Sequence, residues 1–356
     1  MTQNQKLAIG PLNQAGQGRA WANAVSSHLG IDARSIARDG LISARLRGVQ
    51  MNGRAHSTIP HPRITPPMLR TVWTRAVLGG TTHLLNESNI SLLKHPRAHQ
   101  FSDEVLDFQR RGVRMAVVFH GSEIRDPERH KEAFEYSYFK DAPQDWVDNL
   151  DRIVRRNRTF AEDSGLTMFV TTPDLLDHLP GAKLLPLAID TSGWNQTAAA
   201  DFETGRPRVL HRPSRSDPPI KGTQYIHPIL SKLADEGLIE YVHTHEVPHA
   251  DMFMLLNQVD IVVDQIQTGA YGVAAIEAMA AGRLVVGNVT PGAAGVFGSN
   301  VPIVNATPVT FEEVMRDLLA YPETARVTAA SGKEYVAKWH SGIASARSLQ
   351  GFLENS

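Results

Sequence analysis

The chain has 356 residues, of which 42% are hydrophobic and 21% are charged, and it contains no cysteine. This composition is ordinary for a folded globular protein, and it excludes disulfide bonds, thiol nucleophiles and thiolate metal sites. The formal net charge of −1 argues neither for nucleic acid nor for a membrane surface as a partner. No signal-peptide pattern and no stretch of ~20 apolar residues is visible. The sequence therefore predicts a cytoplasmic protein without a nucleic-acid partner.

Short apolar runs of strand length alternate with segments of helical spacing along the whole chain. In chain order these predicted strands are residues 7–10, 82–85, 113–119, 167–171, 183–189, 208–211, 239–243, 260–265 and 283–289. Apolar strands separated by helices indicate parallel sheets that are covered on both faces. Ligands of such sheets bind beyond the carboxyl ends of the strands.

The length of the chain favours two domains over one. Residues 190–207 are small, polar and aperiodic, as expected of a linker between domains. We therefore predict a first α/β lobe over residues 1–190 and a second over residues 191–330. Residues 331–356 have helical spacing and are expected to pack back on the first lobe. The ligand is expected in the cleft between the lobes.

The segment from residue 264 to residue 282 carries the strongest signal of a binding site. A predicted strand leads into a loop with Gly269 and Gly272, and then into an alanine-rich helix in which Glu277 is the only ionisable residue. A buried carboxylate needs hydrogen-bond donors, which the two hydroxyls of a ribose supply, and a helix amino terminus suits a phosphate. The alternative is a tightly packed core helix whose Glu277 bonds to the backbone or to a lysine. The spacing alone does not decide between them.

Tyr271-Gly272, four intervening residues and then Glu277-Ala-Met-Ala-Ala-Gly resemble the signature of the group 1 retaining glycosyltransferases. The resemblance implies the GT-B fold, in which two Rossmann-like lobes with parallel sheets face each other across a cleft. It also implies a nucleotide diphosphate sugar as donor, no further cofactor, and contact between Glu277 and the nucleotide ribose. The family usually has a second glutamate, on the transferred sugar, where this chain has Gly269. Gln265 or Asp264 is the expected substitute.

A second patch, residues 208–226, contains a proline-rich loop with Arg212 and Arg215 and then Lys221 at the start of a helix. A planar guanidinium and a compact ammonium beside a helix start can hold a diphosphate. The alternative is a solvated basic loop. The resemblance assigns charge stabilisation of the leaving diphosphate to Lys221, and to Arg212 or Arg215.

In the first lobe, Gly16 and Gly18 follow the first predicted strand and would allow backbone N–H groups to approach a phosphate or sugar. The alternative is a tight strand-to-helix turn. His120 follows the apolar run 113–119, so it is expected to face the cleft. The resemblance implies that His120 contacts the donor sugar, whereas a lone histidine here is also a common structural hydrogen-bond partner. Three residues nearby are expected on the acceptor side: Ser122, Glu123 and Arg125.

Residues 34–75 contain eight arginines, no lysine and Asp39 as their only acid. Such a local excess predicts a positive surface or pocket for an anionic acceptor or an anionic membrane, and the alternative is arginines solvated singly. His243, His245 and His249 could hold zinc only if the strand continued through them. Because histidines at strand ends are common without metal, and because no Asp-x-Asp pair is present, we predict no metal site.

These observations predict a retaining glycosyltransferase in which the leaving phosphate accepts the proton of the acceptor hydroxyl, so that no dedicated base is required. Two alternatives stay open. One is a nucleotide-sugar epimerase of the same fold, which needs no acceptor. The other is a non-catalytic nucleotide-binding partner subunit that has lost its sugar contact at Gly269.

Overall fold

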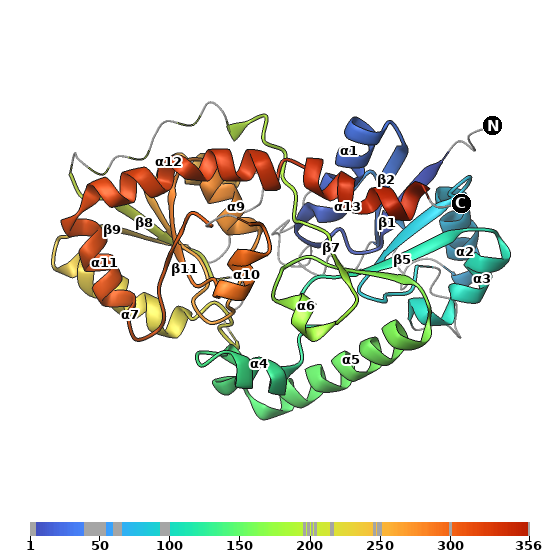
Figure 1. The fold of residues 1–356 in the computed structure, drawn as a ribbon, viewed down its shortest axis with the longest axis horizontal. Coiled ribbons are helices and arrows are strands. Elements are labelled where there is room, and N and C mark those ends of the chain that lie inside the picture. Colours follow the sequence, from blue (N-terminus) through green and yellow to red (C-terminus); the bar gives the residue numbers. More distant parts are fainter. Residues whose placement is uncertain are drawn as a thin grey trace.

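Two parallel sheets divide the chain into two lobes (Figure 1). The computed structural model describes residues 5–38, 55–59, 66–92, 100–194, 197, 200, 202, 205–213, 217–244, 247, 251–298 and 301–354. The first sheet has the order β3-β2-β1-β4-β5-β6-β7, and its strands are β1 (Lys6–Gly10), β2 (Asp32–Arg38), β3 (Ser57–Ile59), β4 (His83–Glu87), β5 (Arg114–Phe119), β6 (Thr167–Val170) and β7 (Lys183–Leu184). The second has the order β12-β11-β10-β8-β9, with β8 (Arg208–His211), β9 (Glu240–His243), β10 (Ile261–Val263), β11 (Leu284–Gly287) and β12 (Ile303–Asn305).

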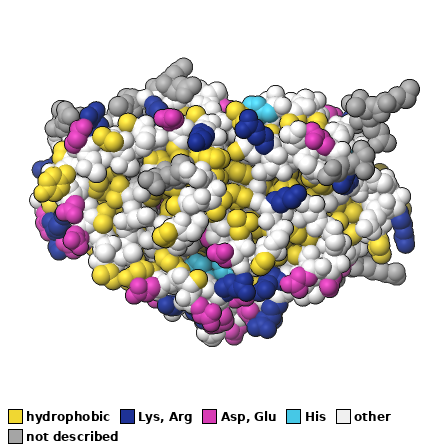
Figure 2. Space-filling model, in the orientation of Figure 1, with side chains coloured by type: hydrophobic (Ala, Val, Ile, Leu, Met, Phe, Trp, Pro, Cys, Tyr) yellow, Lys and Arg dark blue, Asp and Glu magenta, His cyan; other side chains and the backbone are white. Residues whose placement is uncertain are grey.

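Helices connect the strands of both sheets. Those of the first lobe are η1 (Gln14–Gly16), α1 (Gln17–Leu29), α2 (Pro67–Val77), η3 (Phe101–Asp103), α3 (Val105–Arg110), α4 (Pro127–Ala133), η4 (Tyr138–Lys140), α5 (Gln144–Asp163) and α6 (Leu175–His178), where η denotes a 3-10 helix. Those that follow are α7 (Thr223–Asp235), α8 (Met252–Leu256), α9 (Val273–Ala280), α10 (Pro291–Gly295), α11 (Phe311–Ala320), α12 (Pro322–Trp339) and α13 (Ile343–Glu354). Figure 2 shows charged side chains of both signs along the edge formed by α4 and α5.

All nine predicted strands are present, and the described part of the chain contains three further strands that were not predicted. The sequence of β2, DARSIAR, is too polar to be recognised as a buried strand, and β3 and β12 have three residues each. The predicted strand 183–189 is a strand only over its first two residues. Beyond these, the peptide groups of Ala188 bond to the side chain of Gln17, which replaces a neighbouring strand as partner.

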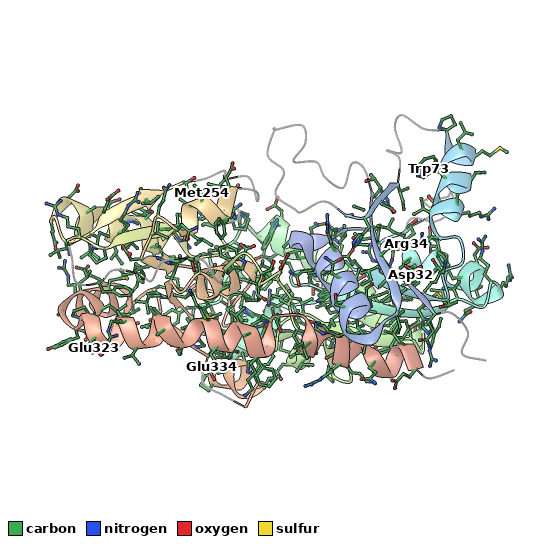
Figure 3. All side chains as sticks on the ribbon, turned by 90° about the horizontal axis from the view of Figure 1, so that it is seen from above. Asp32, Arg34, Trp73, Met254, Glu323 and Glu334 are labelled. Carbon is green, nitrogen blue, oxygen red and sulfur yellow. The ribbon has the colours of Figure 1, made fainter. Side chains whose placement is uncertain are left out.

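The carboxy-terminal helices belong to different lobes. Helix α12 packs against α9 and β11 in the second lobe, whereas α13 packs against α1 in the first (Figures 1 and 3). Gly332 permits the close approach of α12 to α9, because a Cβ atom there would lie 3.1 Å from Met279. The segment 331–356 therefore divides near His340, and only its last part lies on the first lobe. One apolar cluster is continuous through α1, α13, α12 and α9.

A buried hydrogen-bond chain fixes the seam where the two lobes meet. The Nδ1 atom of His340 lies 2.8 Å from the carbonyl oxygen of Leu187, and its Nε2 lies 3.0 Å from the Tyr271 hydroxyl. Burial lowers the pKa of His340 to about 4, so the ring is neutral at pH 7. Nδ1–H then donates to Leu187 and Nε2 accepts from Tyr271, whose oxygen accepts from the Tyr335 hydroxyl at 2.8 Å. Among the described residues, no helix is long and apolar enough to cross a membrane.

The protein is expected to lose stability in mild acid. Burial lowers the pKa of His56 and His83. It acts most strongly on three other histidines, and lowers the pKa to about 3 for His130 and to about 4 for His178 and His340. In the unfolded chain these histidines bind protons below a pH of about 6.5, which favours unfolding. The free energy of unfolding should therefore be level above about pH 7 and fall by about 2 kcal/mol per histidine at pH 5. Urea denaturation at the two pH values measures this change.

The variant His340→Gln should remove about 2 kcal/mol of this change between pH 7 and pH 5, whatever it does to stability at neutral pH. His28→Gln, at an exposed position of α1, is the matched control and should leave the pH dependence unchanged. A pH dependence that is the same in both variants would contradict the assignment.

Candidate functional site

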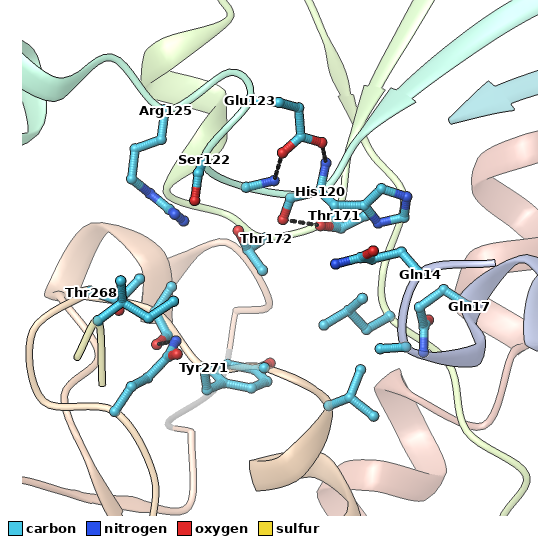
Figure 4. A pocket seen from close by; sticks show the side chains of 18 of the residues that line it. Gln14, Gln17, His120, Ser122, Glu123, Arg125, Thr171, Thr172, Thr268 and Tyr271 are labelled. Carbon is cyan, nitrogen blue, oxygen red and sulfur yellow. Dashed lines mark hydrogen bonds between the residues drawn. The ribbon is translucent and has the colours of Figure 1, made fainter. Parts of the chain in front are cut away.

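A cavity of about 280 Å³ lies between the two lobes. The first lobe contributes residues that follow β1, β5 and β6, and the second lobe contributes the loop after β10 and the start of α9 (Figure 4). Most polar lining residues therefore lie beyond the carboxyl ends of parallel strands, as expected for this architecture. The polar or aromatic lining side chains are Gln14, Gln17, His120, Ser122, Glu123, Arg125, Tyr138, Thr171, Thr172, Gln265, Thr268 and Tyr271.

The loop between β1 and α1 is built around a buried carboxylate, that of Glu87 at the end of β4. Its Oε2 accepts from the backbone N–H groups of Leu12 and Asn13, both at 2.8 Å, and its Oε1 accepts from that of Gln14 at 3.2 Å. Successive backbone N–H groups of this kind can bind an anion, but here the carboxylate of Glu87 already accepts from them. Neither Gly16 nor Gly18 lines the cavity. Gly16, with a φ of +77°, precedes α1, and Gly18 lies in the first turn of that helix, so a contact between their N–H groups and a ligand stays a prediction.

His120 lies at the cavity wall, at the carboxyl end of β5 as predicted. Its ring stacks on Trp21, with 5.7 Å between the ring centroids and 13° between the planes. Its Nε2 lies 3.2 Å from Oε1 of Glu87. The side chain is 8% exposed, so packing against Trp21 holds the ring against the cavity.

The three residues predicted on the acceptor side, Ser122, Glu123 and Arg125, all line the cavity. The carboxylate of Glu123 accepts from the N–H groups of His120, at 2.6 Å, and Gly121, at 3.0 Å. It also accepts from the hydroxyl of Ser88 at 2.7 Å. In this structure the carboxylate of Glu123 therefore fixes the backbone that carries His120.

Arg125 is buried and forms an ion pair with Asp174, which follows β6. Nε and Nη2 both donate to Asp174 Oδ2, at 2.9 and 2.6 Å. Burial alone would lower the pKa of Arg125, but the charge of Asp174 outweighs it and holds the pKa above its ordinary value. Burial would likewise raise the pKa of Asp174, and Arg125 keeps it low. Both groups are therefore charged.

In the second lobe, the amino terminus of α9 forms part of the cavity wall. Gly272, which precedes the helix, and Val273, its first residue, both line the cavity. The first turn contains no acidic residue, so its N–H groups and the positive end of the helix dipole remain suited to an anion. Gln265 also lines the cavity, and its side-chain amide donates to the carbonyl oxygen of Ala270.

The remaining predicted donor residues lie behind this wall. Glu277, one turn into α9, is 6% exposed, and its charge acts on Arg212. Burial lowers the pKa of Arg212, and Glu277 opposes that shift, so the structure brings these two predicted residues together. Lys221 donates to Asp264 Oδ1 at 2.7 Å. Arg215 lies outside the described residues.

Gly269 stands where the resembling family has a glutamate, and the backbone there requires a glycine. Its φ is +74°, a left-handed conformation, and a Cβ atom would lie 2.9 Å from Cγ2 of Thr290. No side chain from this position can therefore reach a sugar. Gln265 lines the cavity and Asp264 is paired with Lys221, so of the two expected substitutes only Gln265 faces the ligand space.

A second contact joins the lobes at the cavity, and it was not predicted. Helices α4 and η4, which we call the clasp, reach across to the loop after β10. The backbone N–H of Tyr138 donates to the carbonyl oxygen of Gln267 at 3.3 Å, and His130 Nε2 lies 3.1 Å from that of Thr268. The amide of Gln267 donates to Asp141 Oδ2 at 2.8 Å. The clasp therefore brings Tyr138 into the cavity wall.

The other sequence predictions fall partly outside the described residues. This holds for His245, His249 and the side chain of His243. Among the residues that the structure describes, no cluster of His, Asp or Glu is arranged to bind a metal ion. Of the eight arginines, residues 45, 47, 54 and 63 and the side chain of residue 70 are also outside. Arg38 is buried, and Arg34 donates to the carbonyl oxygen of Gly79. A positive surface on the first lobe stays a prediction.

Sequence reasoning missed Glu87, Thr172, Asp174 and Tyr138. The first three follow or end predicted strands, so the rule that selected His120 would have found them if it had been applied to every strand. No local signal identifies Tyr138, because its place in the cavity depends on the clasp.

Replacing Glu87 with glutamine should destabilise the protein. An amide can accept with its oxygen only, so its NH2 group would face N–H donors of the β1–α1 loop and leave them unpaired. The expected loss is about 1–3 kcal/mol in the free energy of unfolding, measured by urea denaturation. Glu132→Gln, at an exposed position of α4, is the control. Equal stability of the two variants would show that the loop does not depend on the Glu87 charge.

No protein-family model matches the chain, and no curated protein matches it in sequence. Solved structures match its fold over nearly its full length. A glycosyltransferase from Rickettsia africae ESF-5 has a TM-score of 0.62 at 12% identity, with 100% of both chains covered. Sucrose-phosphate synthase from Thermosynechococcus elongatus has a TM-score of 0.62 at 15% identity, with 98% of both covered. Anabaena HepE, solved with UDP and glucose, has a TM-score of 0.59 at 12% identity, covering 99% of this chain and 100% of its own. The chain therefore has the GT-B fold of these glycosyltransferases, as the sequence predicted.

Proposed function

We propose that the protein is a glycosyltransferase that moves a sugar from a nucleotide diphosphate sugar to a hydroxyl group, with retention at the anomeric carbon. The observation that carries the proposal is the amino terminus of α9 at the wall of the interlobe cavity, with Glu277 one turn behind it beside Arg212. UDP is the first nucleotide to test, because HepE, which shares the fold, is solved with UDP and glucose.

The positions of these groups suit the parts of such a donor. The N–H groups at the start of α9 would receive the diphosphate, and the helix dipole favours its charge. The carboxylate of Glu277 would accept from the ribose hydroxyls, with Arg212 beside it. Lys221 would add positive charge behind the phosphates, although Asp264 balances that charge in the present structure. Stabilisation of the leaving diphosphate is usually the largest contribution in such sites.

Retention without an enzymic nucleophile is supported by the state of Glu123. Among the described lining residues it is the only carboxylate, and its two oxygens already accept from three donors. It would have to abandon the backbone of His120 to attack the sugar. We therefore propose that the leaving phosphate accepts the proton of the acceptor hydroxyl, which attacks from the same face. No metal ion is needed where a helix terminus and basic side chains take up the phosphate charge.

A second candidate function, a nucleotide-binding partner subunit without transfer, is favoured by Gly269, which removes one sugar contact. Incubation with UDP-glucose and a panel of sugar acceptors separates these possibilities, with UDP release as the readout. Transfer predicts acceptor-dependent UDP release that EDTA does not abolish, and a product whose anomeric configuration, measured by NMR, matches that of the donor. A changed sugar nucleotide without acceptor would indicate an epimerase. Stable binding of UDP without any turnover would indicate the partner subunit.

Glu277→Gln should weaken UDP binding by about tenfold or more, because an amide loses the charge that strengthens hydrogen bonds to the ribose hydroxyls. Isothermal titration calorimetry measures the affinity, and circular dichroism checks that the variant is folded. Glu313→Gln, at an exposed position of α11 in the same lobe, is the matched control. Unchanged affinity in a folded Glu277→Gln protein would remove this residue from the site.

A further inference from the structure

The first-lobe side of the cavity contains a buried set of polar groups that the proposed transfer leaves unassigned. Arg125, Tyr138 and Thr172 line the cavity here, and Asp174 lies behind them; we call these four residues the polar niche. Figure 4 shows Arg125 and Thr172 on the same side of the cavity as Ser122. The niche draws on three segments, because Arg125 follows β5, Thr172 and Asp174 follow β6, and Tyr138 belongs to the clasp.

Several donors and acceptors of the niche remain available to a ligand. Arg125 lines the cavity and uses Nε and Nη2 on Asp174, so Nη1 is not engaged by that carboxylate. The side chains of Tyr138 and Thr172 are 2% and 8% exposed. Their hydroxyls lie beside Arg125 and Asp174, yet neither makes a hydrogen bond of good geometry. Buried polar groups in native proteins are nearly always satisfied, so these hydroxyls indicate a partner that the protein itself does not supply.

The charges around the niche oppose an anionic partner. Among the described contacts on this side of the cavity, Arg125 is the one cation that meets a lining residue, apart from histidines. Three carboxylates lie on the same side: Asp174 pairs with Arg125, whereas Glu87 and Glu123 contact His120. Asp174 balances the charge of Arg125. The carboxylates of buried Glu87 and half-buried Glu123 accept from backbone N–H groups and have no lysine or arginine partner among the described contacts. A further negative charge would therefore be repelled, whereas uncharged hydroxyls can both donate and accept here.

The wall that the second lobe contributes, in contrast, favours negative charge. The amino terminus of α9 favours negative charge at Gly272 and Val273. The cavity is thus polarised, with a place for phosphate on one side and for neutral polar groups on the other. Its volume of about 280 Å³ lies just below the usual range for small-molecule sites, which suits a single sugar ring better than a whole nucleotide.

We infer that the polar niche binds the hydroxyl groups of an uncharged sugar ring and selects against sugars that carry a carboxylate or a phosphate. Arg125, Tyr138 and Thr172 form the hydrogen bonds, and Asp174 sets the charge preference. The inference rests on the proposed function and names the class of sugar that the cavity takes. It also supplies the sugar contact that Gly269 cannot make.

Calorimetric titration with UDP, UDP-glucose and UDP-glucuronate tests the charge preference. The wild-type protein should bind UDP-glucose about tenfold or more tightly than UDP-glucuronate. Asp174→Asn removes one negative charge beside Arg125 and should bring the two affinities close to equality. Asp177→Asn, at an exposed position of α6, is the control and should keep the wild-type preference. Equal wild-type affinities for the two sugar nucleotides would overturn the inference.

Two smaller changes test the niche without touching its ion pair. Tyr138→Phe and Thr172→Val each remove one hydroxyl and should weaken UDP-glucose binding by about fivefold, with UDP affinity unchanged. Tyr136→Phe, close by but outside the cavity lining, should have no effect. Wild-type affinity for UDP-glucose in both hydroxyl variants would show that the niche does not hold the sugar.

The ring could belong to the donor or to the acceptor, and a parallel titration distinguishes them. Glucose and glucuronate are titrated into protein saturated with UDP. If the wild-type protein binds UDP-glucose more tightly than UDP and Tyr138→Phe removes this difference in affinity, the donor sugar lies in the niche. If free glucose binds to the UDP-saturated protein and Tyr138→Phe abolishes that binding, the acceptor lies there. Either result supports the inference. Failure of the wild-type protein to bind UDP at all would instead count against the proposed donor.

Discussion

The hydrogen-bond chain from Leu187 through His340 and Tyr271 to Tyr335 links the assembly of the fold to the shape of the cavity. It joins the crossover between the lobes, the junction of α12 and α13, and the loop that leads into α9. Burial raises the pKa of both tyrosines, that of Tyr335 to about 12, so every member stays neutral and each has one defined role as donor or acceptor. Because Tyr271 also lines the cavity, the position of the helix terminus that faces the ligand depends on the docking of the carboxy-terminal helices.

Three carboxylates organise the opposite wall. Glu87 organises the loop after β1, Glu123 organises the loop after β5, and Asp174 orients Arg125. Each carboxylate lies at or just after the carboxyl end of a strand, where exposed N–H groups and cations would otherwise attract external anions. Internal neutralisation leaves a wall that favours hydroxyl groups, while α9 keeps its positive end toward the cavity. The proposed transfer and the proposed sugar preference both follow from this division.

Much of the fold follows from local sequence, because each apolar run reports a buried parallel strand wherever it occurs. The proximity of Glu277 and Arg212 could also be predicted from the sequence, because a helix and a strand of the same lobe bring them together. The side chains that pair with the predicted residues could not be predicted from the sequence. Lys221 meets Asp264 and Arg125 meets Asp174 through loops whose conformation no short motif encodes. Tyr138 lies more than a hundred residues from the loop it contacts, so its role emerges only from the packed structure.

The clasp changes how the two lobes can move. They are joined along the seam at His340 and again where α4 and η4 meet the loop after β10, with the cavity between the two attachments. Because the lobes are attached on both sides of the cavity, they cannot rotate apart about one attachment while the other stays intact. Wide opening therefore requires the bonds of Gln267 and Thr268 to exchange with water first. The lifetime of the contacts between the clasp and this loop would then limit the rate of turnover. Contacts that break quickly would speed product release, but they would also shorten the time during which water is excluded from the cavity.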